Sequence, residues 1–176
     1  MICCNIENKK GGCTLTTYPE GPYRIRSGKN AGNTLEQLMF QKPHLVFYWE
    51  KLQRGSRGNK NKLHPHLEWL LRQGENRRAK ILCPQCRKRP VAYFSVVYSG
   101  RDDFSLGTPF TCCGNDECYN KLESLALAPL EVLPLRFSVM KKRSRLFQRK
   151  VVELFRRVFR LPKPLGVEES FMFFKN

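Results

Sequence analysis

The stretch CPQCRKRPVAYFSVVYSGRDDFSLGTPFTCCGNDEC, residues 83–118, decides the fold, because it holds five of the eight cysteines in the chain. Cys83 and Cys86 form a CxxC pair, which places two thiolates on one tight turn. A tetrahedral zinc ion accepts four ligands of this kind. The second pair must therefore come from the other cysteines of the stretch, Cys112, Cys113 and Cys118.

The segment between the two groups of cysteines predicts a β-hairpin followed by a helix. Residues 91–98 are β-branched and aromatic, which is typical of a strand, and residues 109–112 predict the returning strand. A helical pattern begins at Asp116. A cysteine knuckle, two strands and a cysteine pair at the start of a helix resemble a treble-clef or zinc-ribbon module.

In that family the last ligand lies in the first turn of the helix, so the resemblance implies Cys118. Cys112 ends a strand and points away if Cys113 points toward the metal, because adjacent side chains alternate. The family more often has two residues between its last cysteines, whereas this sequence has four. The choice between Cys112 and Cys113 therefore stays open. The predicted metal ligands are Cys83, Cys86, Cys113 and Cys118, with Cys112 as the alternative to Cys113.

Four thiolates fill every position around a tetrahedral ion and leave none for a catalytic water, so the predicted zinc is structural. Free thiols or a redox-active CxxC pair are the alternatives, and the absence of a βαβ pattern around Cys83 argues against the redox pair. The remaining cysteines, Cys3, Cys4 and Cys13, lack a fourth ligand for a second site.

Helices are predicted before the cysteine stretch. Thr34 and Gln37 form a capping box, so a helix should begin directly after Thr34. A second helix follows Pro43, and a third carries Pro65 in its first turn, with Gly74 expected as its C-cap glycine.

After the cysteine stretch, residues 129–135 are expected to form a Pro/Leu-rich connection, and residues 141–161 to form a basic helix. A last short helix is predicted over residues 167–174. The apolar face of the basic helix contains Phe147, Val151, Leu154, Phe155 and Val158.

The predicted fold class is α+β, with three parts. Residues 1–78 form an irregular arm and a small helical module, and residues 79–130 a treble-clef-like zinc hairpin with a helix. Residues 131–176 form the basic C-terminal helical segment.

The charge of the chain predicts a polyanionic partner. Lys and Arg number 32 against 15 Asp and Glu, which gives a formal net charge of +17, and this excess favours RNA or DNA over a membrane surface or an acidic protein. Two dense clusters lie in residues 51–89, with twelve Lys/Arg and two acids, and residues 141–163, with ten Lys/Arg and one acid. The predicted nucleic-acid contacts are Lys29, Arg54, Arg57, Lys60, Lys62, Arg77, Arg78, Arg87, Lys88, Arg89, Lys141, Lys142, Arg143, Arg145, Arg149, Lys150, Arg156, Arg157 and Arg160.

Aromatic residues of the hairpin allow two interpretations. They either stack on bases from an exposed sheet or form the core of a small zinc module. The residues concerned are Tyr93, Phe94, Tyr98 and Phe104.

The segment IRSGKNAGNTLEQLMFQKPHLVFYW, residues 25–49, resembles the small module at the C-terminus of exonuclease X-type proteins. That module has a Gly-Lys-x-x-Gly-x-Thr motif, a short Leu/Glu helix and a later aromatic segment. The resemblance covers about a fifth of the chain and implies an accessory role beside nucleic acid. Size, charge and cysteine content are also similar to the small zinc-finger subunit of type IV CRISPR effector complexes. The matching positions are Gly28, Lys29, Gly32, Thr34, Leu35 and Glu36, with Trp49 or Trp69 in the aromatic position.

We therefore expect a non-catalytic, zinc-stabilised nucleic-acid-binding protein, a subunit of a phage, mobile-element or CRISPR/defence nucleoprotein complex. A metal-dependent nuclease or nuclease accessory factor is the first alternative, but Asp102 and Asp103 are adjacent and would diverge in a hairpin. His64, His66 and Glu68 do not follow the pattern of a His-Asn-His nuclease. A protein-interaction adaptor is the second alternative.

The expected location is the cytoplasm, where clustered cysteines are more often metal ligands than disulfides. Residues 1–10 lack the apolar run of a secretory signal. Apolar windows are too short for the roughly 18–20 residues that span a bilayer, so no membrane partner is expected.

Overall fold

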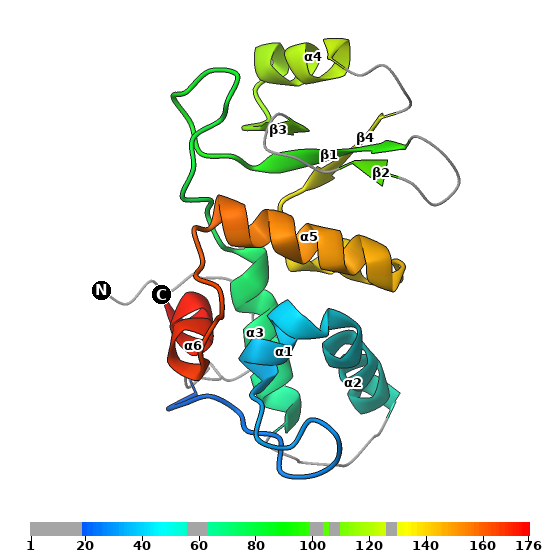
Figure 1. The fold of residues 1–176 in the computed structure, drawn as a ribbon, viewed down its shortest axis with the longest axis vertical. Helices are drawn as coiled ribbons and strands as arrows, with labels where there is room; N and C mark the ends of the chain where they lie inside the picture. Colours follow the sequence, from blue (N-terminus) through cyan, green and yellow to red (C-terminus); the bar gives the residue numbers. More distant parts are fainter. Residues whose placement is uncertain (1–18, 56–62, 99–103, 106–109, 126–129) are drawn as a thin grey trace, which may run out of the picture.

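The computed structural model describes residues 19–55, 63–98, 104–105, 110–125 and 130–176. Helices and one antiparallel sheet make up the structure, which confirms the α+β class. The elements form layers: α4 (Asp116–Ser124) lies on one face of the sheet, α5 (Arg145–Val158) lies across the other face, and the remaining helices pack beyond α5 (Figure 1).

The helical layer contains α1 (Leu35–Gln41), α2 (Pro43–Gly55), α3 (Leu63–Glu75) and α6 (Val167–Lys175). The predicted capping box is present: Thr34 Oγ1 accepts from the Gln37 amide at 3.2 Å, and Gln37 Oε1 accepts from the Thr34 amide at 3.1 Å. These bonds satisfy amides that the first turn leaves without helical partners.

The prediction that Gly74 caps α3 was wrong. Gly74 lies inside the last turn of α3 and is buried. A Cβ at this position would lie 2.9 Å from Cδ2 of Phe137. Glycine is therefore required here by the close approach of a phenylalanine ring and not by a left-handed backbone.

The sheet is built around β1 (Tyr93–Tyr98). Both β2 (Phe104–Ser105) and β3 (Thr111–Cys112) pair antiparallel with β1, at its C-terminal and N-terminal ends respectively. On the other edge, β4 (Leu130–Pro134) pairs with β1 from Val97↔Leu130 to Tyr93↔Pro134.

Residues 129–135, expected only as a Pro/Leu-rich connection, therefore contain a strand that was not predicted. Pro134 is the last residue of β4, which pairs only with β1 and is an edge strand, where proline is tolerated. The strand forms because β1 offers an unpaired edge, which a local reading of the sequence does not reveal.

Helix α5 (Arg145–Val158) lies between the sheet and the helical layer (Figure 1). It follows the short 3-10 helix η2 (Phe137–Met140) and is capped by Ser144, whose Oγ accepts from the Phe147 amide at 3.2 Å. The predicted apolar face is confirmed, since all five of its residues are buried. The helix starts later than predicted, so residues 141–144 precede it.

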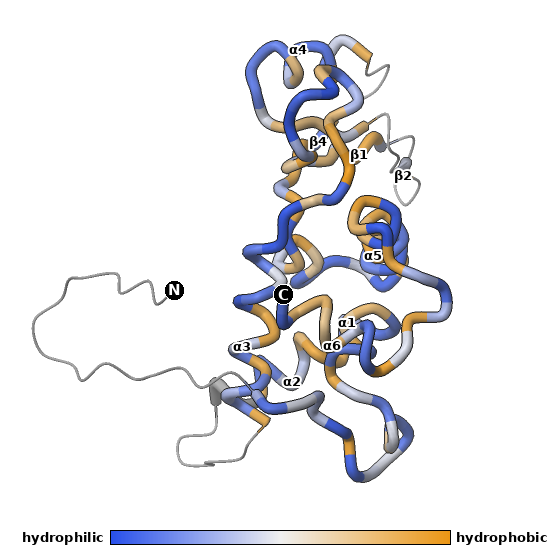
Figure 2. The backbone as a smooth tube through the Cα atoms, turned by 90° about the vertical axis from the view of Figure 1, so that its left-hand side faces the viewer, coloured by the Kyte–Doolittle hydropathy of each residue, from blue (hydrophilic) through white to orange (hydrophobic). Residues whose placement is uncertain are grey.

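Burial on α5 extends beyond a single face. The Phe155 ring contacts Phe94 on the sheet at 6.4 Å between centroids and Phe137 on the helical side at 4.9 Å. Hydrophobic and hydrophilic residues alternate around the turns of α5 in Figure 2. One hydrophobic cluster thus includes residues from all three expected parts of the chain.

Candidate metal centre and basic cleft

The structure brings together the four cysteines predicted as ligands. Cys83 and Cys86 lie between α3 and β1, Cys113 follows β3, and Cys118 lies in the first turn of α4 (Asp116–Ser124). Their Sγ atoms all lie within 4.8 Å of one another. Zinc–sulfur bonds of about 2.3 Å in a tetrahedron imply sulfur–sulfur distances of about 3.8 Å, and Cys86 Sγ lies 3.8 Å from Cys113 Sγ. The cluster can hold one metal ion of this kind.

Backbone geometry forms the first knuckle. The Arg87 amide donates to the Cys83 carbonyl at 2.8 Å, and the Cys83 amide donates to the Arg89 carbonyl at 2.7 Å. Arg87 adopts a left-handed conformation with φ of 54°. Hydrogen bonds from the backbone of Lys88 and then of Arg89 to the Cys86 sulfur lower the pKa of this thiol to about 6. The knuckle therefore favours a thiolate, the form that binds a metal.

The second knuckle is shaped by Gly114 and Asn115. Gly114 has φ of 80°, and a Cβ on it would overlap the ring of Tyr93, so both the backbone conformation and the space require glycine. Asn115 caps α4, with its Oδ1 accepting from the Glu117 amide at 3.2 Å. These contacts hold the first turn of α4, and with it Cys118, against the other ligands.

The pKa of Cys118 is shifted in the opposite direction to that of Cys86. Burial, followed by hydrogen bonds with Cys113 and the other thiols, raises the pKa of Cys118 to about 12. Four neighbouring thiols cannot all ionise without a compensating cation, and a divalent metal supplies one. The donor set thus fits a cation whose binding releases protons.

Cys112 is not part of this group. It is fully buried beside Leu122 of α4, and burial raises its pKa. The alternation argument along the strand therefore assigns the two neighbouring cysteines to different environments, and Cys113 joins the cluster.

The predicted nucleic-acid contacts fall into several groups. Arg57, Lys60 and Lys62 lie outside the described residues, and of Arg54 only the backbone, in α2, is described. Three further cations have partners within the protein: Lys141 Nζ lies 2.9 Å from Glu50 Oε1, Arg143 Nη2 lies 2.5 Å from Glu131 Oε1, and Lys150 donates to the Phe104 carbonyl at 2.5 Å.

Most of the other predicted cations are exposed. None of them forms an ion pair with a carboxylate in the described parts of the chain. Arg87, Lys88 and Arg89 belong to the first knuckle, next to the cysteine cluster. The exposed set consists of Lys29, Arg78, Arg87, Lys88, Arg89, Lys142, Arg145, Arg149, Arg157 and Arg160.

The hairpin aromatics mostly belong to the protein interior. Phe94 is fully buried and Phe104 is nearly so, because this face of the sheet packs on α5. Tyr98 is half-buried and donates from its hydroxyl to Glu131 Oε2 at 2.7 Å. Only Tyr93 of the four is exposed, and its ring covers Gly114. Base stacking by Phe94 and Phe104 is thus excluded in this structure.

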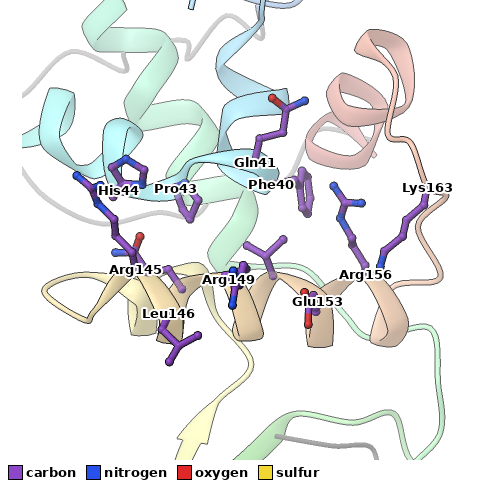
Figure 3. A pocket seen from close by; sticks show the side chains of 12 residues that line it. Phe40, Gln41, Pro43, His44, Arg145, Leu146, Arg149, Glu153, Arg156 and Lys163 are labelled. Atoms are coloured by element: carbon purple, nitrogen blue, oxygen red, sulfur yellow. The ribbon is translucent and has the colours of Figure 1, made fainter. Parts of the chain in front are cut away.

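A cleft of about 420 Å³ lies between α5 and the corner that joins α1 to α2. Four cations line it: Arg145, Arg149, Arg156 and Lys163. Figure 3 shows Arg145 reaching toward His44 at one end and Lys163 extending toward Arg156 at the other. The chain thus gathers positive charge from α5 and from the connection after it into one depression.

The cleft has one acidic lining residue, Glu153, and no described ion pair neutralises its cations. The pKa of His44 is lowered by its burial and then by the positive charges of Arg145 and Lys42. Nε of Arg156 is buried and makes no hydrogen bond. The cleft is therefore positively charged and contains a guanidinium donor, Nε of Arg156, that has no acceptor within the described residues.

Sequence reasoning did not select His44 or Lys163 as site residues. Lys163 lies between two prolines after α5, and His44 lies in the first turn of α2. No local motif connects them, since only the packing of α5 against the α1–α2 corner brings them to the same cleft.

No family model, curated protein or solved structure matches the chain. Among the helices that the structure describes, none is long and apolar enough to cross a membrane.

Proposed function

We propose that this protein is a non-catalytic nucleic-acid-binding subunit of a nucleoprotein complex, stabilised by one zinc ion. The observation that carries the proposal is the cleft beside α5, in which four cations that form no ion pair within the described residues face one acidic residue. Phosphates are the anions that such a row of guanidinium and ammonium groups binds best. The net charge of +17 adds long-range attraction for a polyanion.

Contacts in the cleft would be made to the backbone of the nucleic acid. Phe40 is only 3% exposed, so the phenylalanine of the lining offers no face for base stacking. Arginine and lysine contacts to phosphates position a strand without reading its sequence. We therefore expect binding to RNA or DNA with weak sequence preference.

Zinc would have a structural role. The four thiolates of Cys83, Cys86, Cys113 and Cys118 leave no coordination position for water or substrate. By ordering the first knuckle, the metal fixes the exposed cations Arg87, Lys88 and Arg89 in place. These form a second positively charged surface, next to the metal and apart from the cleft residues.

A subunit role in a phage, mobile-element or CRISPR-type complex is consistent with the resemblance of residues 25–49 to an exonuclease-associated module. The nuclease alternative needs clustered acidic or histidine ligands for a catalytic metal. Within the described residues, the only group able to hold a metal is the cysteine cluster, while Asp102 and Asp103 lie outside those residues.

The salt dependence of binding tests the proposal. Four phosphate contacts to a single strand predict a slope of about −2.8 for log K against log salt concentration, and two contacts predict about −1.4. We expect the double variant Arg145→Gln/Arg149→Gln to change the slope from about −2.8 to about −1.4. The slope is measured by fluorescence anisotropy with a labelled single-stranded oligonucleotide.

The control is the double variant Lys51→Gln/Lys121→Gln, which removes the same charge at exposed positions that do not line the cleft. Its slope should match that of the unmodified protein. Equal effects of the two double variants, or binding that does not vary with salt, would contradict the proposal. Mg²⁺-dependent cleavage lost in Asp102→Asn/Asp103→Asn would establish the nuclease, and tight capture of a protein without nucleic acid would favour the adaptor.

A further inference from the structure

A second pocket, of about 560 Å³, lies where the segment after α3 meets the end of α5 and α6. Its walls include the apolar side chains of Phe159, Leu161, Met172 and Phe173. Its cationic residues are Arg77, Arg78, Lys80 and Arg160, and its one acidic residue is Glu169. Pockets of this size hold small organic ligands.

Arg77 is the unusual residue of this pocket. Its guanidinium carbon lies 5.0 Å from the centroid of the Phe173 ring, and the side chain is mostly buried. Nε and Nη2, which form one edge of the guanidinium, have no accessible surface and make no hydrogen bond. Burial lowers the pKa of Arg77. A buried charge without hydrogen bonds is unfavourable, so arginine is normally buried only with an anionic partner.

The protein does not supply that partner in its described parts. Arg77 forms no ion pair with any described carboxylate, including Glu169 in the same pocket. Arg78, Lys80 and Arg160 also line the pocket and are exposed. These three neighbours add positive charge against the single acidic side chain of Glu169, which favours an anion taken from solution.

We propose that this pocket binds a phosphate monoester. Such a group carries a charge of about −1.5 to −2 at pH 7 and three strong acceptor oxygens, which suits four cations better than a singly charged phosphodiester does. A guanidinium edge forms two parallel hydrogen bonds with a phosphate. The apolar walls beside the cations leave room for the sugar or base that carries the phosphate.

Access to Arg77 requires a local movement. Of its three guanidinium nitrogens, Nη1 alone keeps contact with solvent. A phosphate first meets Nη1, and a change in the side-chain torsions of Arg77 then brings the Nε–Nη2 edge to face the ligand.

Two sources can supply this group: the phosphorylated end of a nucleic acid strand, or a free phosphate or mononucleotide. The site does not depend on the cleft beside α5, since the linings of the two depressions share no residue. Its test therefore separates failure of this pocket from failure of the proposed function.

The test compares oligonucleotides of one sequence with a 5′-phosphate, a 3′-phosphate or hydroxyls at both ends, in parallel with inorganic phosphate and a nucleoside monophosphate. For a strand end we expect at least one phosphorylated oligonucleotide to bind about tenfold or more tightly than the hydroxyl form. The variant Arg77→Gln should remove this preference, so that the phosphorylated and hydroxyl forms bind with equal affinity. Arg72→Gln, an exposed change on α3 outside the pocket, should keep the preference.

Binding of inorganic phosphate or the nucleoside monophosphate, measured by calorimetry, identifies the free ligand as the source if strand ends give no preference. That binding must disappear in Arg77→Gln and weaken in Arg160→Gln, which changes an exposed residue and leaves the buried guanidinium in place. The free-ligand measurement decides the matter even if oligonucleotides do not bind at all. Absence of every phosphate-dependent effect, or effects that persist unchanged in Arg77→Gln, would overturn the proposal.

Discussion

Replacing Cys113 or Cys112 with alanine should have sharply different effects, although the two residues are neighbours. Cys113→Ala removes a sulfur of the four-cysteine group, whereas Cys112→Ala removes a buried sulfur outside it. We expect Cys113→Ala to lose bound zinc and Cys112→Ala to retain one zinc per chain, with a loss in stability of about 1 kcal/mol from the small cavity.

The structure indicates how strongly α4 depends on the metal. Beyond the cysteines, its contacts with the sheet rest on fully buried Leu122 and on partly buried Phe110 and Val132. Even if all three were completely buried, they would contribute at most about 9 kcal/mol. Ordering the backbone of the nine residues of α4 costs about 9–18 kcal/mol. Apolar contacts alone therefore do not hold α4, whereas a structural zinc contributes about 10–16 kcal/mol.

Hydrogen exchange provides the assay. In Cys113→Ala, or after treatment with a strong chelator, the amides of α4 should lose protection while those of α5 stay protected by the main hydrophobic cluster. Zinc content is measured on the same samples by mass spectrometry. The reasoning would be refuted if α4 stayed protected without metal, or if Cys112→Ala released zinc as completely as Cys113→Ala.

Two further outcomes follow from packing and charge. Gly74→Ala should lower stability by about 1–3 kcal/mol because its Cβ would press on the Phe137 ring, whereas Gly21→Ala, with open space around it, should change the midpoint of thermal unfolding little. The pKa of His44 is lowered in the folded protein, so folding favours the neutral imidazole. The stability linked to this preference is present above the unfolded pKa of about 6.5 and is lost as the pH falls below that value. Urea unfolding at pH 7.5 and 5.5 should therefore show a smaller loss of stability on acidification for His44→Gln than for the unmodified protein, and an equal loss would contradict this assignment.

Features with local causes could be predicted from the sequence. The capping box at Thr34 depends only on residues one helical turn apart, and the apolar spacing of α5 follows from its own sequence. That Cys112 and Cys113 face different environments followed from the alternation of side chains along a strand, but which of the two joins the cluster did not. In each case the determining residues are close together in the chain.

Features that depend on distant partners could not be predicted. Strand β4 exists because β1 offers an edge, and Gly74 is explained only by Phe137, which belongs to η2. The cleft beside α5 likewise combines His44 with Lys163, and neither carries a local signal of its role. The roles of the hairpin aromatics also depended on knowing that α5 covers the sheet.

The pairing of β4 with β1 bears on how this protein can be divided for experiment. A fragment of residues 79–130 would contain every cysteine of the metal cluster, but it would end where β4 begins. One edge of β1 would then be unpaired, and Phe94 and Val96 would lose the cover of α5. Exposed strand edges and apolar faces promote aggregation. A fragment that carries the metal cluster must therefore continue through α5 to fold. The metal affinity of the shorter fragment, residues 79–130, would not represent that of the intact protein.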